Sequence, residues 1–306
     1  MVSGRKARRQ SMSAAPAPTT STVRSYYRAI LAFYEREVAS RRDLAFWRRL
    51  CERWRPETIL EAGCGLGAVT GALATHASVV GFDLSVRMLG RARTRLRRTP
   101  HPVRLFAADA RGLALKRRFD LIVAAGDPFS HWTRLADRRA ALRALGRHLT
   151  DRGRLVVDGL LRTGPGPIVV PERPIGRRGS FRLRETWTRS ARPNVWIARF
   201  VYRRAGDSGA PEAAAVFQAR SWDPDEVDHF FASCGFAVED VRGDFNGSPL
   251  RRDSSRLIVT ARRQRSSTPD PAFSAAPPEE ETSAARAAAS AAGRRGSASR
   301  RRGRRR

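Results

Sequence analysis

Short apolar runs alternate with amphipathic stretches between residues 58 and 158. Strand-length runs are expected at Thr58–Glu61, Ser78–Asp83, Val103–Ala107, Asp120–Ala125 and Arg154–Asp158. Between these runs the apolar residues recur every three to four positions, which predicts helices at Ala68–His76, Ser85–Arg98 and Asp137–Leu149. Strands that alternate with helices at this spacing indicate βαβ units, and therefore a parallel sheet.

The pattern is different on either side of this segment. Residues 22–54 have helical periodicity, with apolar side chains at Tyr26, Ile30, Phe33, Tyr34 and Val38. Residues 168–220 instead alternate with a period of two, which predicts an antiparallel insertion with strands at Phe181–Trp187, Val195–Tyr202 and Ala214–Arg220. A helix that begins near Pro224 and strands at Phe236–Val241 and Arg256–Ala261 complete a predicted domain of residues 22–262.

Both ends of the chain have the composition of disordered segments. Residues 1–21 contain few large apolar side chains, and residues 263–306 combine an acidic triplet with low-complexity sequence rich in Arg, Ala and Ser. We therefore expect a disordered leader and a disordered tail. The leader loosely resembles a transit peptide, and an early start codon ahead of a true start at Met12 explains it equally well.

The formal net charge is +30, and it is not confined to the two ends. Such a charge attracts nucleic acid, anionic lipid or acidic ligands. However, lysine occurs only at Lys6 and Lys116, and the abundance of Arg with Ala, Gly and Pro is the pattern of a GC-rich genome. We interpret the charge mainly as a result of that composition, and secondarily as a sign of non-specific contact between the arginine-rich tail and nucleic acid.

Other features of the composition exclude several classes of protein. No run approaches the roughly 18 uncharged apolar residues that a membrane-spanning helix needs. Cys51, Cys64 and Cys234 lie far apart and form no Cys-x-x-Cys pair, so we expect neither a disulfide framework nor a metal site. Isolated thiols are usual in the cytoplasm, so the sequence predicts a soluble cytoplasmic protein without a membrane partner.

One glycine-rich segment carries candidate chemistry. An apolar strand runs directly into Gly63-Cys64-Gly65-Leu66-Gly67, and a helix follows. Glycine lets a ligand approach the backbone, and the start of the helix presents unpaired N–H groups. Asp83 ends the second strand, where a carboxylate is suited to accept hydrogen bonds from both hydroxyls of a ribose. Asp83 alone would also fit a helix cap before Ser85, but together with the glycines it favours an adenosyl ligand.

At these residues the chain resembles the class I S-adenosylmethionine-dependent methyltransferases, and in particular their small bacterial members. Glu61-Ala62-Gly63-Cys64-Gly65-Leu66-Gly67 matches the cofactor loop of that family and differs from the Gly-x-Gly-x-x-Gly of dinucleotide sites. Further matches follow in the family's order, at Gly81–Met88, Phe106–Ala110, Phe119–Val123 and His148–Val156. The resemblance covers about residues 25–262.

The resemblance implies an α/β fold with a Rossmann-like, seven-stranded, mostly parallel sheet that has helices on both faces and one antiparallel strand. It also implies that the antiparallel insertion of residues 168–220 covers the active site as a lid. The implied cofactor is S-adenosyl-L-methionine, with Asp109 near its adenine amino group and Tyr34 near its methionine end. The implied cofactor-binding residues are Tyr34, Glu61, Ala62, Gly63, Gly65, Asp83, Leu84, Met88, Asp109, Ala110 and Ala125.

The loop after the fourth strand supplies the catalytic candidate, because ligands in open α/β sheets bind at the carboxyl ends of the strands. His131 in this loop is a candidate general base or substrate contact, since histidine titrates near neutral pH. A histidine packed under the lid fits the sequence as well. Asp127 is expected either near the sulfonium or as a turn-forming residue before Pro128.

Aromatic residues in and beside the insertion have two interpretations. Trp187, Trp196, Tyr202 and Trp222 form either a wall against a cationic or planar substrate or the packed core of a small sheet.

Three functions are compatible with the sequence. The leading hypothesis is a methyltransferase that acts on a small molecule of unknown identity. An RNA or other nucleic-acid methyltransferase that uses the basic surface and tail is the alternative, but Asp127-Pro128-Phe129 lacks the second proline of the D/N-P-P-Y motif that accommodates a flipped base. The third is a cofactor-binding protein without catalytic activity.

Overall fold

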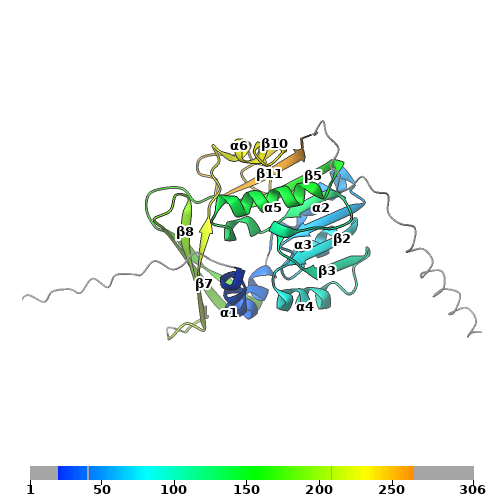
Figure 1. Ribbon diagram of the computed structural model, residues 1–306. Coiled ribbons are helices and arrows are strands. Elements are labelled where there is room, and N and C mark those ends of the chain that lie inside the picture. The colour runs from blue at the N-terminus through cyan, green and yellow to red at the C-terminus, as the bar shows by residue number, and fades with distance from the viewer. Residues whose placement is uncertain (1–19, 40, 208, 265–306) are drawn as a thin grey trace, which may run out of the picture. The chain divides into compact units, whose positions relative to one another are not determined.

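The computed structural model describes residues 20–39, 41–207 and 209–264, and its main feature is a seven-stranded sheet (Figure 1). The strand order is β10-β11-β5-β4-β1-β2-β3. The strands are β1 (Thr58–Ala62), β2 (Ser78–Asp83), β3 (Val103–Ala107), β4 (Phe119–Ala124), β5 (Leu149–Leu160), β10 (Phe236–Arg242) and β11 (Arg256–Arg263). β1 to β5 pair in parallel, whereas β11 is antiparallel to both of its neighbours. The predicted sheet with one antiparallel strand is therefore confirmed.

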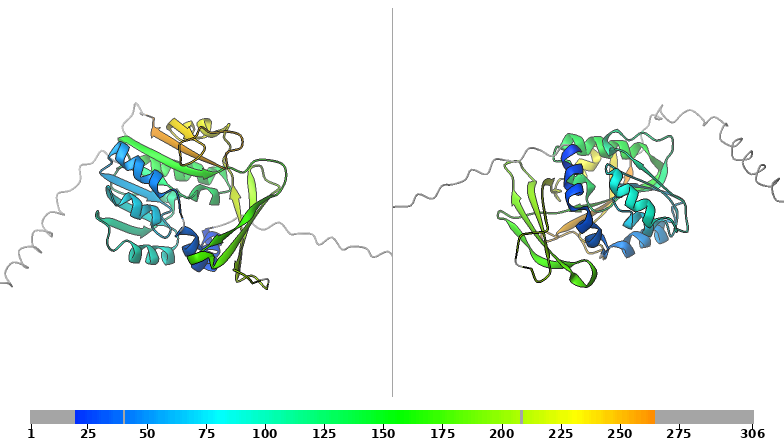
Figure 2. Two further views of the ribbon diagram at one scale, coloured as in Figure 1. Left: turned by 180° about the vertical axis from the view of Figure 1, so that it is seen from behind. Right: turned by 90° about the horizontal axis from the view of Figure 1, so that it is seen from below.

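Helices cover both faces of this sheet (Figures 1 and 2). The helices are α2 (Leu44–Trp54), α3 (Ala68–Leu73), α4 (Val86–Arg95), α5 (Leu135–Arg147) and α6 (Val227–Ala232). α2 and α3 bury Trp47 and Leu73 against one face, and α5 and α6 bury Leu142 and Phe231 against the other. α4 packs on β2 and β3. Because both faces are covered, the parallel strands read as continuous apolar runs in the sequence.

The insertion forms a separate antiparallel sheet of four strands in consecutive order. Its strands are β6 (Ile168–Ile175), β7 (Phe181–Arg189), β8 (Val195–Arg204) and β9 (Ala213–Arg220). The span agrees with the predicted insertion of residues 168–220. The sequence pattern missed β6, because Pro171 and Pro174 argue against a strand. Proline is tolerated there since β6 is an edge strand whose register shifts between Val170 and Arg173.

Helix α1 (Thr20–Val38) lies between the two sheets (Figures 1 and 2). One side of α1, which includes Tyr27 and Leu31, packs against Leu66 and Met88 of the main domain. Another side buries Ile30 and Phe33 in the core of the insertion. The periodicity of the sequence indicated a single apolar face, whereas α1 has two because both sides of the helix are covered.

Both ends of the described domain run slightly past the predicted limits of residues 22 and 262, since α1 begins at Thr20 and β11 ends at Arg263. Most of the predicted leader and tail, residues 1–19 and 265–306, lies outside the described residues. In the part of the chain that the structure describes, no helix is long and apolar enough to cross a membrane. The same residues contain no cluster of His, Cys, Asp and Glu side chains arranged to hold a metal ion.

Candidate active site

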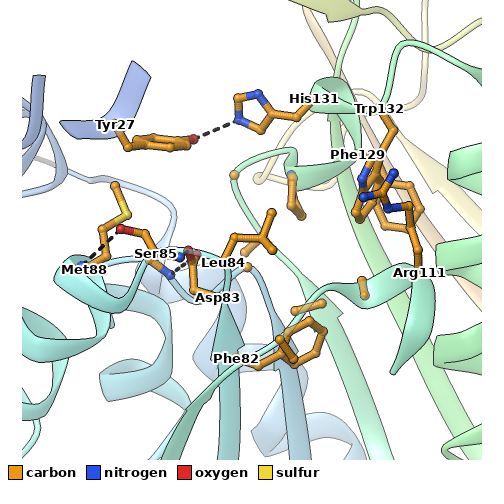
Figure 3. A pocket seen from close by; sticks show the side chains of 18 of the residues that line it. Tyr27, Phe82, Asp83, Leu84, Ser85, Met88, Arg111, Phe129, His131 and Trp132 are labelled. Atoms are coloured by element: carbon orange, nitrogen blue, oxygen red, sulfur yellow. Dashed lines mark hydrogen bonds between the residues drawn. The ribbon is translucent and has the colours of Figure 1, made fainter. Parts of the chain in front are cut away.

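A cavity opens at the carboxyl ends of β1, β2 and β4 (Figure 3). The strand order reverses between β1 and β4, and this is where open α/β sheets bind their ligands. The cavity encloses about 1140 Å³ when its open mouth is included. Ligand pockets usually measure roughly 300–1,000 Å³, so there is room for a nucleoside-sized cofactor together with a second molecule.

The glycine loop forms the floor of the cavity. Gly63 and Gly65 line it, with φ angles of +72° and +51° that side-chain-bearing residues rarely adopt. A β-carbon on Gly63 would lie 2.9 Å from Cβ of Pro128, which also lines the cavity. The backbone N–H groups of Gly63 and Cys64 donate to the carbonyl of Phe82, at 2.9 and 3.0 Å, and so tie the loop to β2. The loop therefore presents bare backbone to the cavity.

Asp83 places a buried carboxylate beside this loop. Its Oδ2 accepts from the Gly65 N–H at 2.9 Å, and its Oδ1 accepts from the Ser85 N–H at 2.8 Å. Burial raises the pKa of Asp83, and the backbone hydrogen bonds from Ser85 and Gly65 oppose that rise. Each carboxylate oxygen can accept a further hydrogen bond. A carboxylate held this way fits the ribose hydroxyls of an adenosyl cofactor.

Most of the predicted cofactor-binding residues line this one cavity. They are Tyr34, Ala62, Gly63, Gly65, Asp83, Leu84, Met88, Ala110 and Ala125. Leu84 follows β2, Ala110 follows β3 and Ala125 follows β4, so three strand ends supply small or apolar side chains to the cavity lining. This arrangement suits a flat adenine ring next to the ribose.

Glu61 does not line the cavity. It lies below the glycine loop, 2% exposed, and accepts a short hydrogen bond from Oγ1 of Thr70 in α3. Burial raises the pKa of Glu61 to about 7, although the hydrogen bond from Thr70 opposes this rise. Its position supports the junction of β1 and α3, and its predicted contact with the cofactor stays a prediction.

Asp109 also lies outside the cavity lining. Its carboxylate caps the short helix η1 (Ala110–Gly112) by accepting from the Arg111 N–H at 3.0 Å, and it pairs with the Arg111 guanidinium at 2.6 Å. Arg111 in turn binds Asp137 of α5 at 3.0 Å and lines the cavity. The predicted contact between Asp109 and the adenine amino group stays a prediction, and it is Arg111, not Asp109, that lines the cavity.

His131 and Tyr27 meet at the far end of the cavity from Asp83 (Figure 3). The Tyr27 hydroxyl and Nε2 of His131 share a hydrogen bond of 2.9 Å, and both residues line the cavity. The imidazole also packs against Phe217 of the insertion, with ring centroids 5.4 Å apart. Burial lowers the pKa of His131 to about 4, so its imidazole is neutral at physiological pH. His131 thus contacts both the cavity and the insertion.

The loop that carries His131 is held from below by a buried polar network. Asp127 has a left-handed backbone, with φ at 56°, and is 1% exposed. Its Oδ1 accepts from the Ser130 N–H at 3.1 Å and its Oδ2 from the Leu160 N–H at 3.0 Å. Asp127 therefore acts as a turn-forming residue that ties the helix η2 (Pro128–His131) to β5, and its carboxylate does not line the cavity.

Arg138 of α5 fixes the same loop from the other side. This buried guanidinium donates to the carbonyls of Phe129 and Trp132, at 3.1 and 3.2 Å, and to the carbonyl of Arg220 in β9. It also lies over the Trp222 ring, 4.6 Å from the ring centroid. Arg138 thereby joins the His131 loop to the insertion.

Several residues of this site were not predicted, among them Tyr27, Arg41 and Arg138. Tyr27 lies two helical turns before Tyr34, a spacing that a search for a second face of α1 would have found. Arg41 lies next to the cavity, with its Nη1 3.3 Å from the position of a β-carbon on Gly126, and it pairs with Asp43. In the sequence, Arg138 is one of several arginines in a predicted helix, so no local pattern indicates that it is buried.

Trp187, Trp196 and Tyr202 pack in the core of the insertion, whereas Trp222 packs in the core of the main domain. Trp187, Trp196, Tyr202 and Trp222 are each at most 4% exposed, and none lines the cavity. The packing interpretation of these residues therefore agrees with the structure.

Known proteins share both the sequence pattern and the fold. A family model described as a methyltransferase domain matches residues 59–153, which include the glycine loop and the His131 loop. A search of curated proteins gives no significant match.

Several solved structures are similar over most of their length. An S-adenosylmethionine-dependent methyltransferase from Clostridium acetobutylicum is 16% identical, with a TM-score of 0.63, and the match covers 78% of this chain and 99% of that one. CalS10, an amino pentose methyltransferase from Micromonospora echinaspora solved with S-adenosylmethionine bound, is 23% identical, with a TM-score of 0.59 and coverage of 76% and 96%. The sugar N-methyltransferase KedS8 from Streptoalloteichus sp. is 19% identical, with a TM-score of 0.54 and coverage of 86% and 99%.

The structural similarity shows the fold, and the family-model match shows which domain carries the cofactor loop. Together with the Asp83 carboxylate and the bare glycine backbone, they identify S-adenosylmethionine as the cofactor. Residues 59–153 thus carry a methyltransferase domain, and the fold around it is that of S-adenosylmethionine-dependent methyltransferases.

Proposed function

We propose that this methyltransferase transfers the methyl group to a small-molecule acceptor that binds beside Tyr27 and His131. The observation that carries the proposal is the enclosure of that end of the cavity. Tyr27 and Tyr34 of α1 cover it, and their rings contact each other with centroids 5.4 Å apart. α1 itself is fixed by Ile30, which is fully buried. An acceptor that reacts under this cover fits best if it is small.

The chain's own residues bind and orient the two reactants. Asp83 and the glycine loop would hold the adenosyl end, with Met88 beside Gly65 and Ser85, and the Tyr27–His131 pair lies across the same cavity (Figure 3). The cofactor supplies a methyl group on a positively charged sulfur. Alignment of donor and acceptor, together with the exclusion of water by aromatic side chains, is then the main catalytic contribution of the protein.

The state of His131 favours a neutral nitrogen as the methyl acceptor. In the transfer, the bond between sulfur and the methyl carbon breaks as the acceptor's lone pair forms the new bond, and the acceptor nitrogen then loses a proton. A hydroxyl acceptor needs a base before the transfer, but an imidazole whose pKa is about 4 is a weak one. We therefore propose that neutral His131 and Tyr27 orient an amine by hydrogen bonding. The names of CalS10 and KedS8, which refer to an amino pentose and to sugar N-methylation, support the same acceptor class.

We further propose that the insertion acts indirectly. No residue of its four strands lines the cavity, but Phe217 packs on His131 and the core of the insertion buries Ile30 and Phe33 of α1. The insertion would hold the cover of the site in place, which is a form of the predicted lid.

A transfer experiment tests this function. The protein is incubated with cofactor labelled on the methyl group and a cell extract, and the label is then followed into small-molecule, nucleic-acid and protein fractions. We expect label in the small-molecule fraction, and we expect the Asp83→Ala variant to lose it. Label that enters RNA or DNA instead would contradict the proposal, and so would tight cofactor binding without transfer to any fraction.

A further inference from the structure

A second groove continues from the active-site cavity to the protein surface between α1 and the first turn of α4. It shares Tyr27, Leu84 and Ser85 with the cavity, so the two spaces adjoin between Tyr27 and the segment that follows Asp83. The rest of its lining consists of Arg28 and Leu31 from α1 and of Val86 and Arg87 from α4. The groove therefore lies directly next to Tyr27, whose hydroxyl shares a hydrogen bond with His131 in the cavity.

The charges in this groove are unbalanced. Arg28 and Arg87 are both exposed, and neither forms an ion pair with any residue that the structure describes. By contrast, Arg91, one turn further along α4, pairs with Glu35 of α1 at 3.6 Å. No acidic side chain lines the groove. The groove is thus lined by two guanidinium groups and by no carboxylate.

The same groove has an apolar side. Val86 is 64% exposed, the joint highest value among the large apolar side chains described, and Leu31 lies beside it in the groove lining. A ligand with an apolar body would cover Val86 and Leu31, and an anionic group on that ligand would meet the arginines. Arginine binds carboxylate and phosphate groups through paired, charge-assisted hydrogen bonds.

We propose that this groove binds the methyl acceptor, and that it selects a small acceptor with a carboxylate or phosphate group held by Arg28 and Arg87. The inference rests on the proposed small-molecule function and adds the chemical class of the substrate. In this arrangement the anionic group stays at the outer end of the groove, the apolar part lies on Leu31 and Val86, and the nucleophile reaches Tyr27 and His131.

The first test analyses the labelled small molecules from the transfer experiment by anion exchange, before and after treatment with phosphatase. We expect the labelled product to be retained on the column. Loss of retention after phosphatase identifies a phosphate monoester, and unchanged retention indicates a carboxylate. The Arg28→Gln/Arg87→Gln variant should transfer label to this product about tenfold more slowly or worse, as for lost charge-assisted hydrogen bonds. A labelled product that is not retained overturns this inference but leaves the proposed function intact.

The second test needs no acceptor. The full-length protein is saturated with S-adenosylhomocysteine and titrated with benzoate, phenyl phosphate or benzyl alcohol in ligand-observed NMR. We expect at least one of the two anions to bind more tightly than the alcohol, and the double variant to weaken that binding about tenfold or more.

The matched control is Arg95→Gln/Arg97→Gln, which removes two exposed arginines at the other end of α4. The control should bind all three probes as the unmodified protein does. Equal affinity for all three probes, or equal weakening in both double variants, would overturn the inference.

Discussion

At the scale of a single residue, Asp83 combines the proposed contact with the cofactor and the structure of the glycine loop. Its two oxygens hold the Gly65 and Ser85 N–H groups, and the same carboxylate faces the cavity. A substitution there removes a ligand contact and two internal hydrogen bonds together, so a test of its role has to separate the two effects.

We predict that Asp83→Ala weakens cofactor binding by roughly 1.5–3 kcal/mol, as expected for a lost charge-assisted hydrogen bond. Calorimetric titration with S-adenosylhomocysteine measures this difference. Asp120→Ala is the matched control, because Asp120 also accepts two backbone N–H groups, from Glu57 and Thr58, but lies outside the cavity lining. If both variants bind with unchanged affinity, Asp83 does not contact the ribose.

Glu61 makes stability depend on pH. Burial raises its pKa from 4.5 to about 7, so the folded protein keeps a proton that the unfolded chain releases between these values. The stability that this proton contributes is present below pH 4.5 and is lost as the pH rises through 7. The difference corresponds to about 3 kcal/mol for a shift of this size.

We therefore predict that the cofactor-free protein loses stability between pH 5 and pH 8 relative to Glu61→Gln, which cannot release a proton. Urea unfolding of both proteins at the two pH values gives the comparison. Because Asp127 titrates in the same range in both proteins, its contribution cancels in the difference. If the free energy of unfolding changes with pH by the same amount in both proteins, Glu61 is not a buried carboxyl group with a raised pKa.

At the scale of elements, the contact between β5 and the segment after β9 supports the His131 loop. Gly159 of β5 lies against Trp222, and a β-carbon there would be 2.2 Å from the indole ring. The same indole packs on Phe129 of η2, with centroids 5.7 Å apart, and lies under the Arg138 guanidinium. The absence of a side chain at Gly159 thus allows the packing that supports the His131 loop.

We predict that Gly159→Ala lowers the free energy of unfolding by about 1–3 kcal/mol, which is the usual cost of overpacking a buried contact. Gly166→Ala is the control, since an added β-carbon at Gly166 meets no atom within 4 Å. Urea unfolding monitored by tryptophan fluorescence measures both. Equal stability of the two variants would contradict the tight packing of Trp222 on β5.

The whole molecule shows how far sequence patterns determine this fold. The βαβ order and the insertion of residues 168–220 follow from local periodicity, because each strand or helix carries its own pattern. The single antiparallel strand was implied only by the family resemblance. The cavity floor was predictable for the same reason: Gly63, Gly65 and Asp83 belong to short motifs at the ends of successive strands.

The unpredicted features depend on contacts between distant segments. Tyr27 meets His131 across 104 positions of the chain, and Arg138 reaches the carbonyl of Arg220 across 82. The carboxylate of Asp109 pairs with Arg111, a residue that no motif includes. Arg111 also pairs with Asp137 of α5. Such partners are set by packing, and periodicity carries no information about them.

The central claim is that the cofactor lies with its ribose on Asp83 and its methyl-bearing end toward Tyr27 and His131. A crystal structure of the protein with S-adenosylhomocysteine tests this claim most directly. We predict electron density for the ribose hydroxyls within hydrogen-bond distance of the Asp83 carboxylate, adenine between Leu84 and Ala110, and the sulfur at the Tyr27 end. Density in the opposite orientation, or at a site away from the glycine loop, would contradict the account.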